Sequence, residues 1–297
     1  MKKMLFVMNP YSGTRKANQY LPEIISLFNQ AGFDVTVRMT SGPQDAAAVV
    51  ERLAGESDVV VCCGGDGTFN ETVTGVLRSG VDVPIGYIPA GSTNDFAASL
   101  KLSTNIMQAA QDIVEGVPNR YDVGKFGDRY FSYVASFGAF TKASYTTPQS
   151  VKNVLGHTAY VLEGIQELSQ IRREHLRLEL NGEVIEDDFI FGAISNSTSV
   201  GGILTLDPSR VDMADGKLEV LLVRMPKDLL ELSECIRAVK AMDYNNCATI
   251  SFRSAEKIRV FADPEMLWTL DGEREEGHEM VEVENVHNAI RILQKEK

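Results

Sequence analysis

The stretch Val59-Val-Val-Cys-Cys-Gly-Gly-Asp-Gly-Thr-Phe-Asn-Glu71 joins an apolar run to a glycine-rich turn and then to a helix-like pattern. Residues 59–63 are apolar and mostly β-branched, which indicates a buried strand, and apolar residues recur at helical spacing from Thr68 to Leu77. Glycines allow backbone N–H groups to approach an anion, because no Cβ blocks the approach, and a helix dipole favours negative charge there. The stretch predicts a phosphate-binding turn, although glycines that serve only a tight turn would produce the same pattern.

Asp66 is the unusual member of this turn, because a carboxylate among phosphate-binding amides repels phosphate unless a divalent cation lies between them. We therefore expect a nucleotide-phosphate site that works with Mg²⁺. A second loop, Ala90-Gly-Ser-Thr-Asn-Asp95, follows a strand predicted at 84–88, and Asn9-Pro-Tyr-Ser-Gly13 follows one predicted at 4–8. Ligands of open parallel sheets bind outside the carboxyl ends of the strands, so the three loops should converge on one crevice.

Two carboxylates of these loops, Asp66 and Asp95, are candidates to hold a hydrated Mg²⁺, and Ser12, Ser92 and Thr93 offer hydroxyl groups beside them. Asp95 has an alternative interpretation as the N-cap of a helix that starts at the next residue. The two roles are not exclusive, since a capping carboxylate can also face a ligand.

The bulk composition limits the classes of protein to consider. The chain has 297 residues, enough for two domains, and its hydrophobic content of 44% is that of a globular protein. Its net charge of −12 argues against nucleic-acid binding, which needs a basic footprint. No apolar stretch approaches the roughly 20 residues that span a bilayer. The four cysteines lack metal-ligand spacing and indicate reduced thiols, so we expect a cytoplasmic protein that at most visits a membrane surface.

The alternation of elements changes near Arg120. Up to that point strands and helices alternate, as in a doubly wound α/β domain. Beyond it, short strand-like runs and turn signals follow, among them the hairpin signal Asn181-Gly182, and helices are expected at 152–171 and 227–242. This pattern predicts an antiparallel sandwich or barrel. The predicted fold is therefore an N-terminal doubly wound α/β nucleotide-binding domain, residues 1–122, followed by a C-terminal antiparallel β-sandwich domain, residues 123–285.

Two acidic segments of the second half carry weaker signals. Asp271-Gly-Glu273 follows a predicted strand, where a carboxylate beside glycine can act as a general base on a hydroxyl group. The same residues lie in an acidic stretch that would also suit a solvated loop. Asp212 and Asp215 precede Gly216 and could bind a hard cation, or could simply form a turn. The sequence contains neither a Walker-type phosphate loop nor H-E-x-x-H.

The motifs taken together resemble the diacylglycerol kinase catalytic-domain family, specifically the soluble bacterial lipid kinases related to diacylglycerol and sphingosine kinases. The Gly-Gly-Asp-Gly-Thr element alone is shared with NAD kinases and phosphofructokinases, whereas the Asn-Pro-x-Ser-Gly and Thr-Asn-Asp-Phe elements separate those families from this one. The matching motifs occur in the order of the family along almost the whole chain. They are Asn9-Pro-Tyr-Ser-Gly13, Gly64-Gly-Asp-Gly-Thr-Phe-Asn-Glu71, Pro89-Ala-Gly-Ser-Thr-Asn-Asp-Phe-Ala97, Asp215-Gly-Lys-Leu218 and Asp271-Gly-Glu273.

The resemblance implies ATP and Mg²⁺ as cofactors, and it implies that residues 286–297 return to the first domain. Asp66 and Asp95 would organise the catalytic Mg²⁺ through waters, and Asp271 would take the proton of the acceptor hydroxyl, with Glu273 as the alternative base. A second, structural Mg²⁺ is expected at the Asp215 carboxylate and the main-chain oxygens of Asp212 and Lys217. The nucleotide would be bound by Asn9, Pro10, Tyr11, Ser12, Gly13, Thr40, Gly64, Gly65, Asp66, Gly67, Thr68, Asn70, Glu71, Gly91, Ser92, Thr93 and Asn94.

Two local departures from the family pattern concern the nucleotide. The loop reads Pro-Ala-Gly-Ser-Thr-Asn-Asp where Pro-x-Gly-Thr-x-Asn-Asp is commoner, so the hydroxyl role falls on either Ser92 or Thr93. The loop after Thr40 carries Pro43, which affects the expected contact with adenine.

The expected activity is transfer of the γ-phosphate of ATP to a lipid alcohol, with diacylglycerol first among the acceptors. The alternatives are a soluble-substrate kinase of the NAD-kinase type and a non-catalytic regulator that binds nucleotide or lipid. Transient contact with a membrane surface is expected, and Lys142, Lys152, Arg172 and Arg173 are its basic candidates, unless they form a solvated helix face. A homodimer through an edge strand is also open.

Overall fold

The computed structural model describes residues 1–138, 172–200 and 204–295, and its chain forms two compact units. The first unit contains residues 1–123, 213–216 and 286–297, and the second contains residues 124–212 and 217–285. The helix expected at 152–171, which contains Lys152, lies outside the described residues, and so does Lys142. Each unit is considered by itself.

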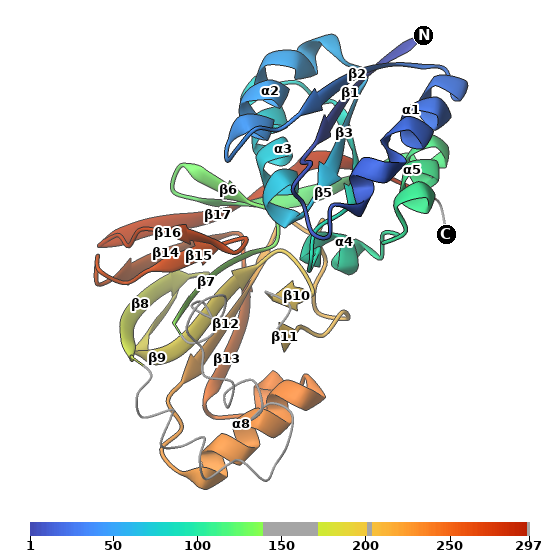
Figure 1. Ribbon diagram of the computed structural model, residues 1–297. Helices are drawn as coiled ribbons and strands as arrows, with labels where there is room; N and C mark the ends of the chain where they lie inside the picture. The colour runs from blue at the N-terminus through green and yellow to red at the C-terminus, as the bar shows by residue number, and fades with distance from the viewer. Residues whose placement is uncertain (139–171, 201–203, 296–297) are drawn as a thin grey trace. The chain divides into compact units, whose positions relative to one another are not determined.

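The first unit is built on a parallel sheet in the order β2-β1-β3-β4, and the last part of β17 continues it beyond β4. Helices α1 and α5 lie on one face of this sheet, and α2 and α3 lie on the other (Figure 1). The strands and helices up to the end of β5 are β1 (Lys2–Met8), η1 (Lys16–Tyr20), α1 (Leu21–Gln30), β2 (Phe33–Met39), α2 (Asp45–Leu53), η2 (Ala54–Glu56), β3 (Val59–Gly64), α3 (Asp66–Ser79), β4 (Pro84–Pro89), α4 (Asp95–Leu100), α5 (Ile106–Glu115) and β5 (Val117–Phe126).

The strand register brings the three predicted loops to one edge of this sheet. Met8 is paired with Cys63, and Gly64 with Pro89, so β1, β3 and β4 end side by side. The helix after the glycine turn begins at Asp66, two residues earlier than the expected start at Thr68. Asp66 and Gly67 therefore belong to the first turn of α3 rather than to the loop before it.

Close packing of α2 on α3 depends on Gly75. A side chain at this position would place its Cβ 2.6 Å from the Ala47 carbonyl oxygen and 2.7 Å from the Val50 Cβ. On the other face, α1 and α5 cover the sheet with apolar side chains such as Phe28 and Ile113, which are buried. The α/β layers expected from the alternating pattern are thus confirmed, because helices bury both faces of the parallel strands.

The second unit is an antiparallel β structure with the strand order β16-β15-β7-β9-β8-β14-β17, and β12 joins β9 to β13. It confirms the expected C-terminal β domain, and the hairpin of β8 and β9 turns at Asn181 and Gly182, which both have positive φ. Its elements are β6 (Arg129–Phe131), β7 (Val134–Gly138), β8 (Glu174–Leu180), β9 (Glu183–Ser195), β10 (Ser199–Val200), β11 (Leu204–Thr205), β12 (Leu218–Arg224), α8 (Leu229–Ala241), η4 (Tyr244–Asn246), β13 (Ile250–Ala255), β14 (Lys257–Ala262), β15 (Trp268–Leu270), β16 (Glu273–Glu275) and β17 (Met280–Gln294).

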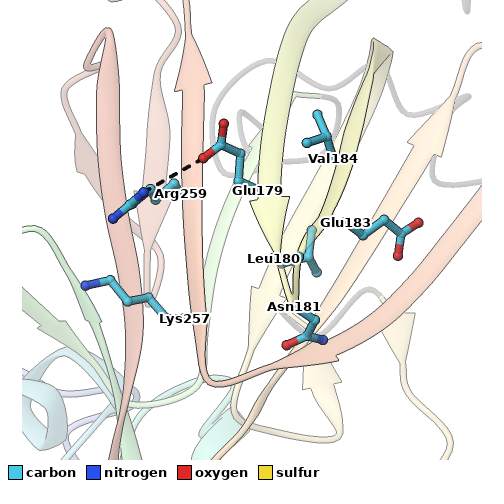
Figure 2. A pocket seen from close by; sticks show the side chains of 8 residues that line it. Glu179, Leu180, Asn181, Glu183, Val184, Lys257 and Arg259 are labelled. Atoms are coloured by element: carbon cyan, nitrogen blue, oxygen red, sulfur yellow. Dashed lines mark ion pairs between the residues drawn. The ribbon is translucent and has the colours of Figure 1, made fainter.

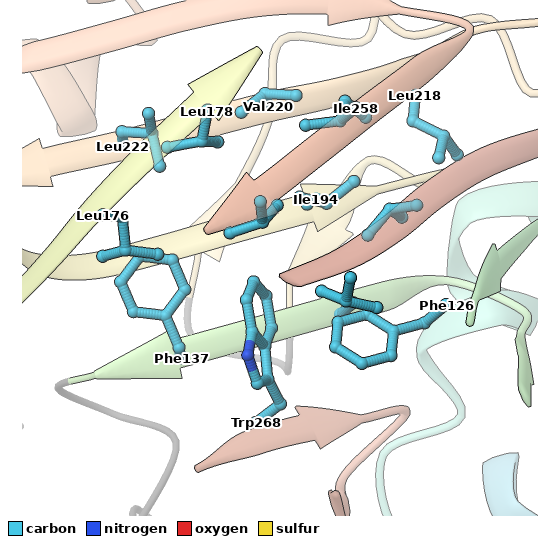
Figure 3. Packing of buried hydrophobic residues seen from close by; sticks show 14 of the residues in the cluster. Phe126, Phe137, Leu176, Leu178, Ile194, Leu218, Val220, Leu222, Ile258 and Trp268 are labelled. Carbon is cyan, nitrogen blue, oxygen red and sulfur yellow. The ribbon is translucent and has the colours of Figure 1, made fainter. Parts of the chain in front are cut away.

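The core of the second unit is centred on Trp268. Its ring centroid lies 4.9 Å from that of Phe126 and 5.0 Å from that of Phe137, and Figure 3 shows the indole between the two phenyl rings. Leucine, isoleucine and valine side chains of β8, β12 and β14 complete the cluster. All four cysteines of the chain are free and buried, in agreement with the expected reduced thiols.

Candidate active site

The three loops of the first unit pack backbone against backbone. The Asn9 N–H donates to the Cys63 carbonyl at 3.0 Å, and the Ala90 N–H donates to the Gly64 carbonyl at 2.7 Å. A Cβ at Gly13, where φ is +50°, would lie 2.4 Å from the Ala90 carbonyl oxygen. The approach is this close only because glycine stands at the contact point, so the expected convergence of the loops is present in the structure.

Side chains of the first loop hold the glycine turn in place. The Asn9 amide donates to Thr68 Oγ1 at 3.1 Å, and its carbonyl oxygen accepts the Tyr11 N–H at 2.9 Å. Ser12 Oγ accepts the Gly65 N–H at 3.3 Å. Tyr11 itself is exposed, with Arg15 over its ring. Asn9, Ser12 and Thr68 therefore connect two of the predicted loops, and Tyr11 is on the surface beside them.

Asp66 and Asp95 are the buried acids of this edge. Each is the first residue of a helix, α3 for Asp66 and α4 for Asp95. Asp66 accepts the Thr93 hydroxyl at 3.1 Å and the Phe96 N–H at 3.4 Å. The interpretation of Asp95 as an N-cap is wrong: Asn94 occupies the N-cap position of α4, and the carboxylate of Asp66 accepts an N–H of the first turn instead.

The electrostatics of this pair fit a bound cation. Burial raises the pKa of Asp66, and the negative charge of Asp95 raises it further. A hard divalent cation with oxygen ligands would relieve both effects. No group of three or more histidine, cysteine or acidic side chains with metal-binding geometry occurs among the described residues. A Mg²⁺ ion here would therefore take its ligands from water and phosphate, as Mg²⁺ commonly does, and the two carboxylates would hold it through those waters.

The loop after β4 is closed by Asn94. Its side-chain oxygen accepts the Gly91 N–H at 2.9 Å, and its amide donates to the Gly91 carbonyl at 3.1 Å. Asn94 adopts φ +55°, a conformation that asparagine tolerates better than most residues. This amide is therefore engaged within the loop, whereas Ser92 and Gly91 lie nearer the surface.

A stack of three buried aromatic rings lies at the start of the two helices that carry the acids. The Phe69 ring lies between Tyr87, at a centroid distance of 4.4 Å, and Phe96, at 4.5 Å, and all three are buried. Phe69 follows the glycine turn and Phe96 follows Asp95 directly in sequence. The stack therefore joins the starts of α3 and α4. The sequence gives no sign of it, because the three rings come from α3, β4 and α4 and meet only in the folded unit.

Glu71 contacts the loop that precedes α2. Its carboxylate oxygens accept the Gln44 N–H at 2.8 Å and the Ala46 N–H at 3.1 Å. The same loop contains Thr40, which is 8% exposed and whose N–H donates to the Met8 carbonyl. Both Glu71 oxygens therefore have backbone donors, which points to a role in holding this loop. Asn70 is buried one residue earlier in α3.

Asp271 and Glu273 belong to the second unit, where Asp271 is the first residue of the two-residue turn between β15 and β16 and Glu273 begins β16. The Asp271 carboxylate is buried and accepts the N–H groups of Ser132 at 2.5 Å and of Tyr133 and Val134 at 3.0 Å each. Glu273 is half-exposed and forms an ion pair with Arg129 at 3.2 Å. The backbone thus fixes the orientation of Asp271, whereas a cation neutralises Glu273.

The three residues expected to hold a structural metal ion are exposed. Asp215 lies in the segment 213–216 of the first unit, whereas Asp212 and Lys217 belong to the second. The Lys217 carbonyl accepts the Asn285 amide at 2.9 Å.

A buried acid that sequence inspection missed, Asp122, holds the segment of Asp215. Its carboxylate accepts the Gly216 N–H at 2.7 Å, the Asn288 N–H at 2.7 Å and a hydrogen bond from His287 Nδ1 at 2.9 Å, the histidine donating in this tautomer. Its own N–H donates to the Met213 carbonyl. The spacing of these partners along the chain gives no local signal, so only the folded unit reveals the group.

One hollow, of about 360 Å³, lies at the hairpin of β8 and β9 (Figure 2). Its charged side chains are paired: Arg259 with Glu179, Lys257 with Glu282, and Glu183 with Arg253. The hollow contains none of the predicted site residues. We therefore place the candidate chemistry at the loops and carboxylates above. No helix among the described residues is long and apolar enough to cross a membrane.

Comparison with known proteins covers both units. Residues 3–126 match the diacylglycerol kinase catalytic domain, and residues 134–294 match the YegS C-terminal NAD kinase beta sandwich-like domain. The diacylglycerol kinase of Bacillus subtilis is 31% identical over 92% of this chain and 90% of its own length. That of Staphylococcus saprophyticus is 30% identical over 92% and 89%. A crystal structure described as a diacylglycerol kinase from Bacillus anthracis shares the fold, with a TM-score of 0.76 at 22% identity over 99% of this chain and 97% of its own.

Proposed function

Since this chain belongs to the diacylglycerol kinase family, and is thus a kinase, we propose that it transfers the γ-phosphate of ATP to the hydroxyl group of diacylglycerol. The products are phosphatidic acid and ADP, and the hydroxyl proton passes to a base of the protein. The observation that carries the proposal is the buried pair Asp66 and Asp95 beside glycine-rich loops, because this pair suits a Mg²⁺ ion that accompanies a nucleotide.

The first unit supplies the nucleotide site in this proposal. Backbone N–H groups of the glycine turn and the start of α3 bind the phosphates, with Ser12 and Thr68 holding the turn in shape. Asp66 and Asp95 would hold Mg²⁺ through water. The positive charge of the ion would offset the negative charge on the phosphate oxygens. Of the two hydroxyl candidates, Ser92 and Thr93, we assign the role to Thr93, supported by the hydrogen bond that its hydroxyl donates to the Asp66 carboxylate.

Asp271 is the proposed proton acceptor of the second unit. Three N–H donors fix the orientation of its carboxylate, and an ionised carboxylate can take up the proton of a hydroxyl group. Glu273 is the weaker candidate, because Arg129 neutralises it in an ion pair. The structural Mg²⁺ site at Asp215, with the main-chain oxygens of Asp212 and Lys217, remains part of the proposal, supported by the way Asp122 holds the segment of Asp215.

Contact with a membrane follows from the proposed acceptor, because diacylglycerol resides in a bilayer. We place the reaction at the cytoplasmic face, where ATP is available. Of the basic candidates for this contact, Arg172 is engaged with Glu174 and Asp263, so it is not a free cation. The expected homodimer stays a prediction.

The test is transfer of label from γ-labelled ATP, with Mg²⁺, to diacylglycerol in mixed micelles. The Asp271→Asn variant should lose turnover by at least about a hundredfold, the usual contribution of a general base, and should still bind ATP. Asp263→Asn, at an exposed acid of the same unit, is the matched control and should keep full activity.

Other results would contradict the proposal in distinct ways. NAD is included as a second acceptor, because the description of the second matching domain mentions NAD kinase. Label in NADP but not in lipid would indicate an NAD-kinase-type activity. Binding of ATP without transfer to any acceptor would indicate a regulator. Full activity of Asp271→Asn would remove this residue from the base role.

A further inference from the structure

Three strand ends of the second unit meet at Asp271. Strand β7 pairs with β15 on one side, where Leu270 is opposite Ala135, and with β9 on the other, where Ser195 is opposite Val134. Asp271 follows β15 directly, and Ser195 is the last residue of β9. The sheet register thus places Ser195 on the far side of the segment that holds the Asp271 carboxylate.

The peptide unit between Tyr133 and Val134 links the two residues. Its N–H, that of Val134, donates to Asp271 Oδ1 at 3.0 Å. Its carbonyl oxygen, that of Tyr133, accepts the Ser195 hydroxyl and the Asn196 N–H at 2.9 Å each. Donors at the carbonyl end of a peptide strengthen the hydrogen bond that its N–H makes, because chains of hydrogen bonds polarise one another.

The Ser195 hydroxyl is fully committed within this network. Ser195 is 1% exposed, and its oxygen also accepts the Ser197 N–H at 3.1 Å. Its single hydrogen serves either the Tyr133 or the Ser197 carbonyl, both at 2.9 Å, whereas the Asn196 N–H stays on the Tyr133 carbonyl. A buried hydroxyl needs such partners to offset its lost hydration. The Ser195 hydroxyl is thus a buried, hydrogen-bonded part of the segment around Asp271.

We propose that Ser195 is a positioning residue for Asp271: its hydroxyl steadies the Tyr133 carbonyl, and through the same peptide unit it fixes the carboxylate that receives the substrate proton. This inference rests on the proposed function for the meaning of Asp271. The geometric part, that Ser195 holds residues 132–134, does not depend on any activity.

The test compares Ser195→Ala with Ser197→Ala. Ser197 is the matched control: it is also buried and lies in the same turn, but its hydroxyl donates to the Ser199 carbonyl rather than to that of Tyr133. Loss of one neutral hydrogen bond corresponds to about a three- to tenfold change. Ser195→Ala should therefore lower kcat with diacylglycerol and ATP by about three- to tenfold and leave KM for ATP unchanged. Ser195→Thr, which keeps the hydroxyl, should restore kcat, and Ser197→Ala should behave as the wild type.

Two further measurements separate positioning from general stability. In an Asp271→Asn background, adding Ser195→Ala should leave the residual rate unchanged, because residues that act through one another are not additive. A further fall in rate would overturn the proposal. Amide hydrogen exchange of residues 132–134 should accelerate in Ser195→Ala and not in Ser197→Ala, whether or not lipid is phosphorylated.

The outcomes distinguish the two claims. Unchanged exchange at 132–134 in Ser195→Ala overturns the inference even if the chain proves to be a diacylglycerol kinase. Accelerated exchange with full activity in Asp271→Asn supports the geometric link but rejects the base role. Loss of activity in Asp271→Asn with wild-type kcat in Ser195→Ala keeps the proposed function and rejects the positioning role.

Discussion

Replacement of Glu71 tests whether its carboxylate holds the nucleotide loop before α2. The side chain accepts the N–H groups of Gln44 and Ala46, which lie at the start of that helix and would otherwise lack helical partners. Glu71→Ala removes both acceptors. Glu71→Gln keeps one carbonyl oxygen and turns an NH₂ group towards the other N–H, so its effect should be about half as large.

The expected size follows from these two hydrogen bonds. A hydrogen bond to a charged acceptor contributes about 1.5–3 kcal/mol, but the Gln44 N–H is exposed and water can replace its partner. We therefore expect Glu71→Ala to lower the free energy of unfolding by about 1–3 kcal/mol in total. If ATP binding must then order the loop that contains Thr40, a cost of about 1 kcal/mol raises KM for ATP roughly fivefold.

The assay measures thermal unfolding and the kinetics of label transfer in parallel. Glu51→Gln is the control, because this glutamate is exposed on α2 and should leave both quantities unchanged. A fall in stability with unchanged KM for ATP would show that Glu71 serves only the fold. Unchanged stability and KM in Glu71→Ala would refute the reasoning altogether.

Two other predictions concern stability. Gly75→Ala should lower the free energy of unfolding, measured by denaturant titration, by about 1–3 kcal/mol. The reason is that overpacking against Ala47 and Val50 outweighs the gain in helix propensity. A more stable variant would contradict this prediction. Gly55→Ala, where a Cβ meets only Val81 at 3.7 Å, is its control. The raised pKa of Asp66 means that the folded state binds more protons than the unfolded state above pH 3.8, so stability without Mg²⁺ should fall as pH rises through that window. Asp66→Asn should therefore unfold at a higher temperature than the wild type at neutral pH, with the difference fading towards pH 3.8, and should lose kinase activity; a lower unfolding temperature would contradict the sign.

The two fold classes could be read from local patterns. Strand–helix alternation up to Arg120 and the hairpin signal at Asn181-Gly182 are properties of neighbouring residues, and both predicted elements are present. The glycine loops could also be recognised in the sequence. Backbones can approach this closely only where there is no Cβ, so glycine is required at Gly13 and Gly91. Strand β17 runs without a break from Met280 to Gln294, which local alternation did not indicate.

The sequence by itself determined where the acids and glycines stand relative to the strand ends, because strand and helix periods are set by local residue order. Only the tertiary structure decided which groups each acid contacts. Asp271 receives N–H donors from residues 132–134, and Asp122 receives them from Gly216 and Asn288. Such partners are far apart along the chain and meet only through strand pairing, so no spacing in the sequence reveals them.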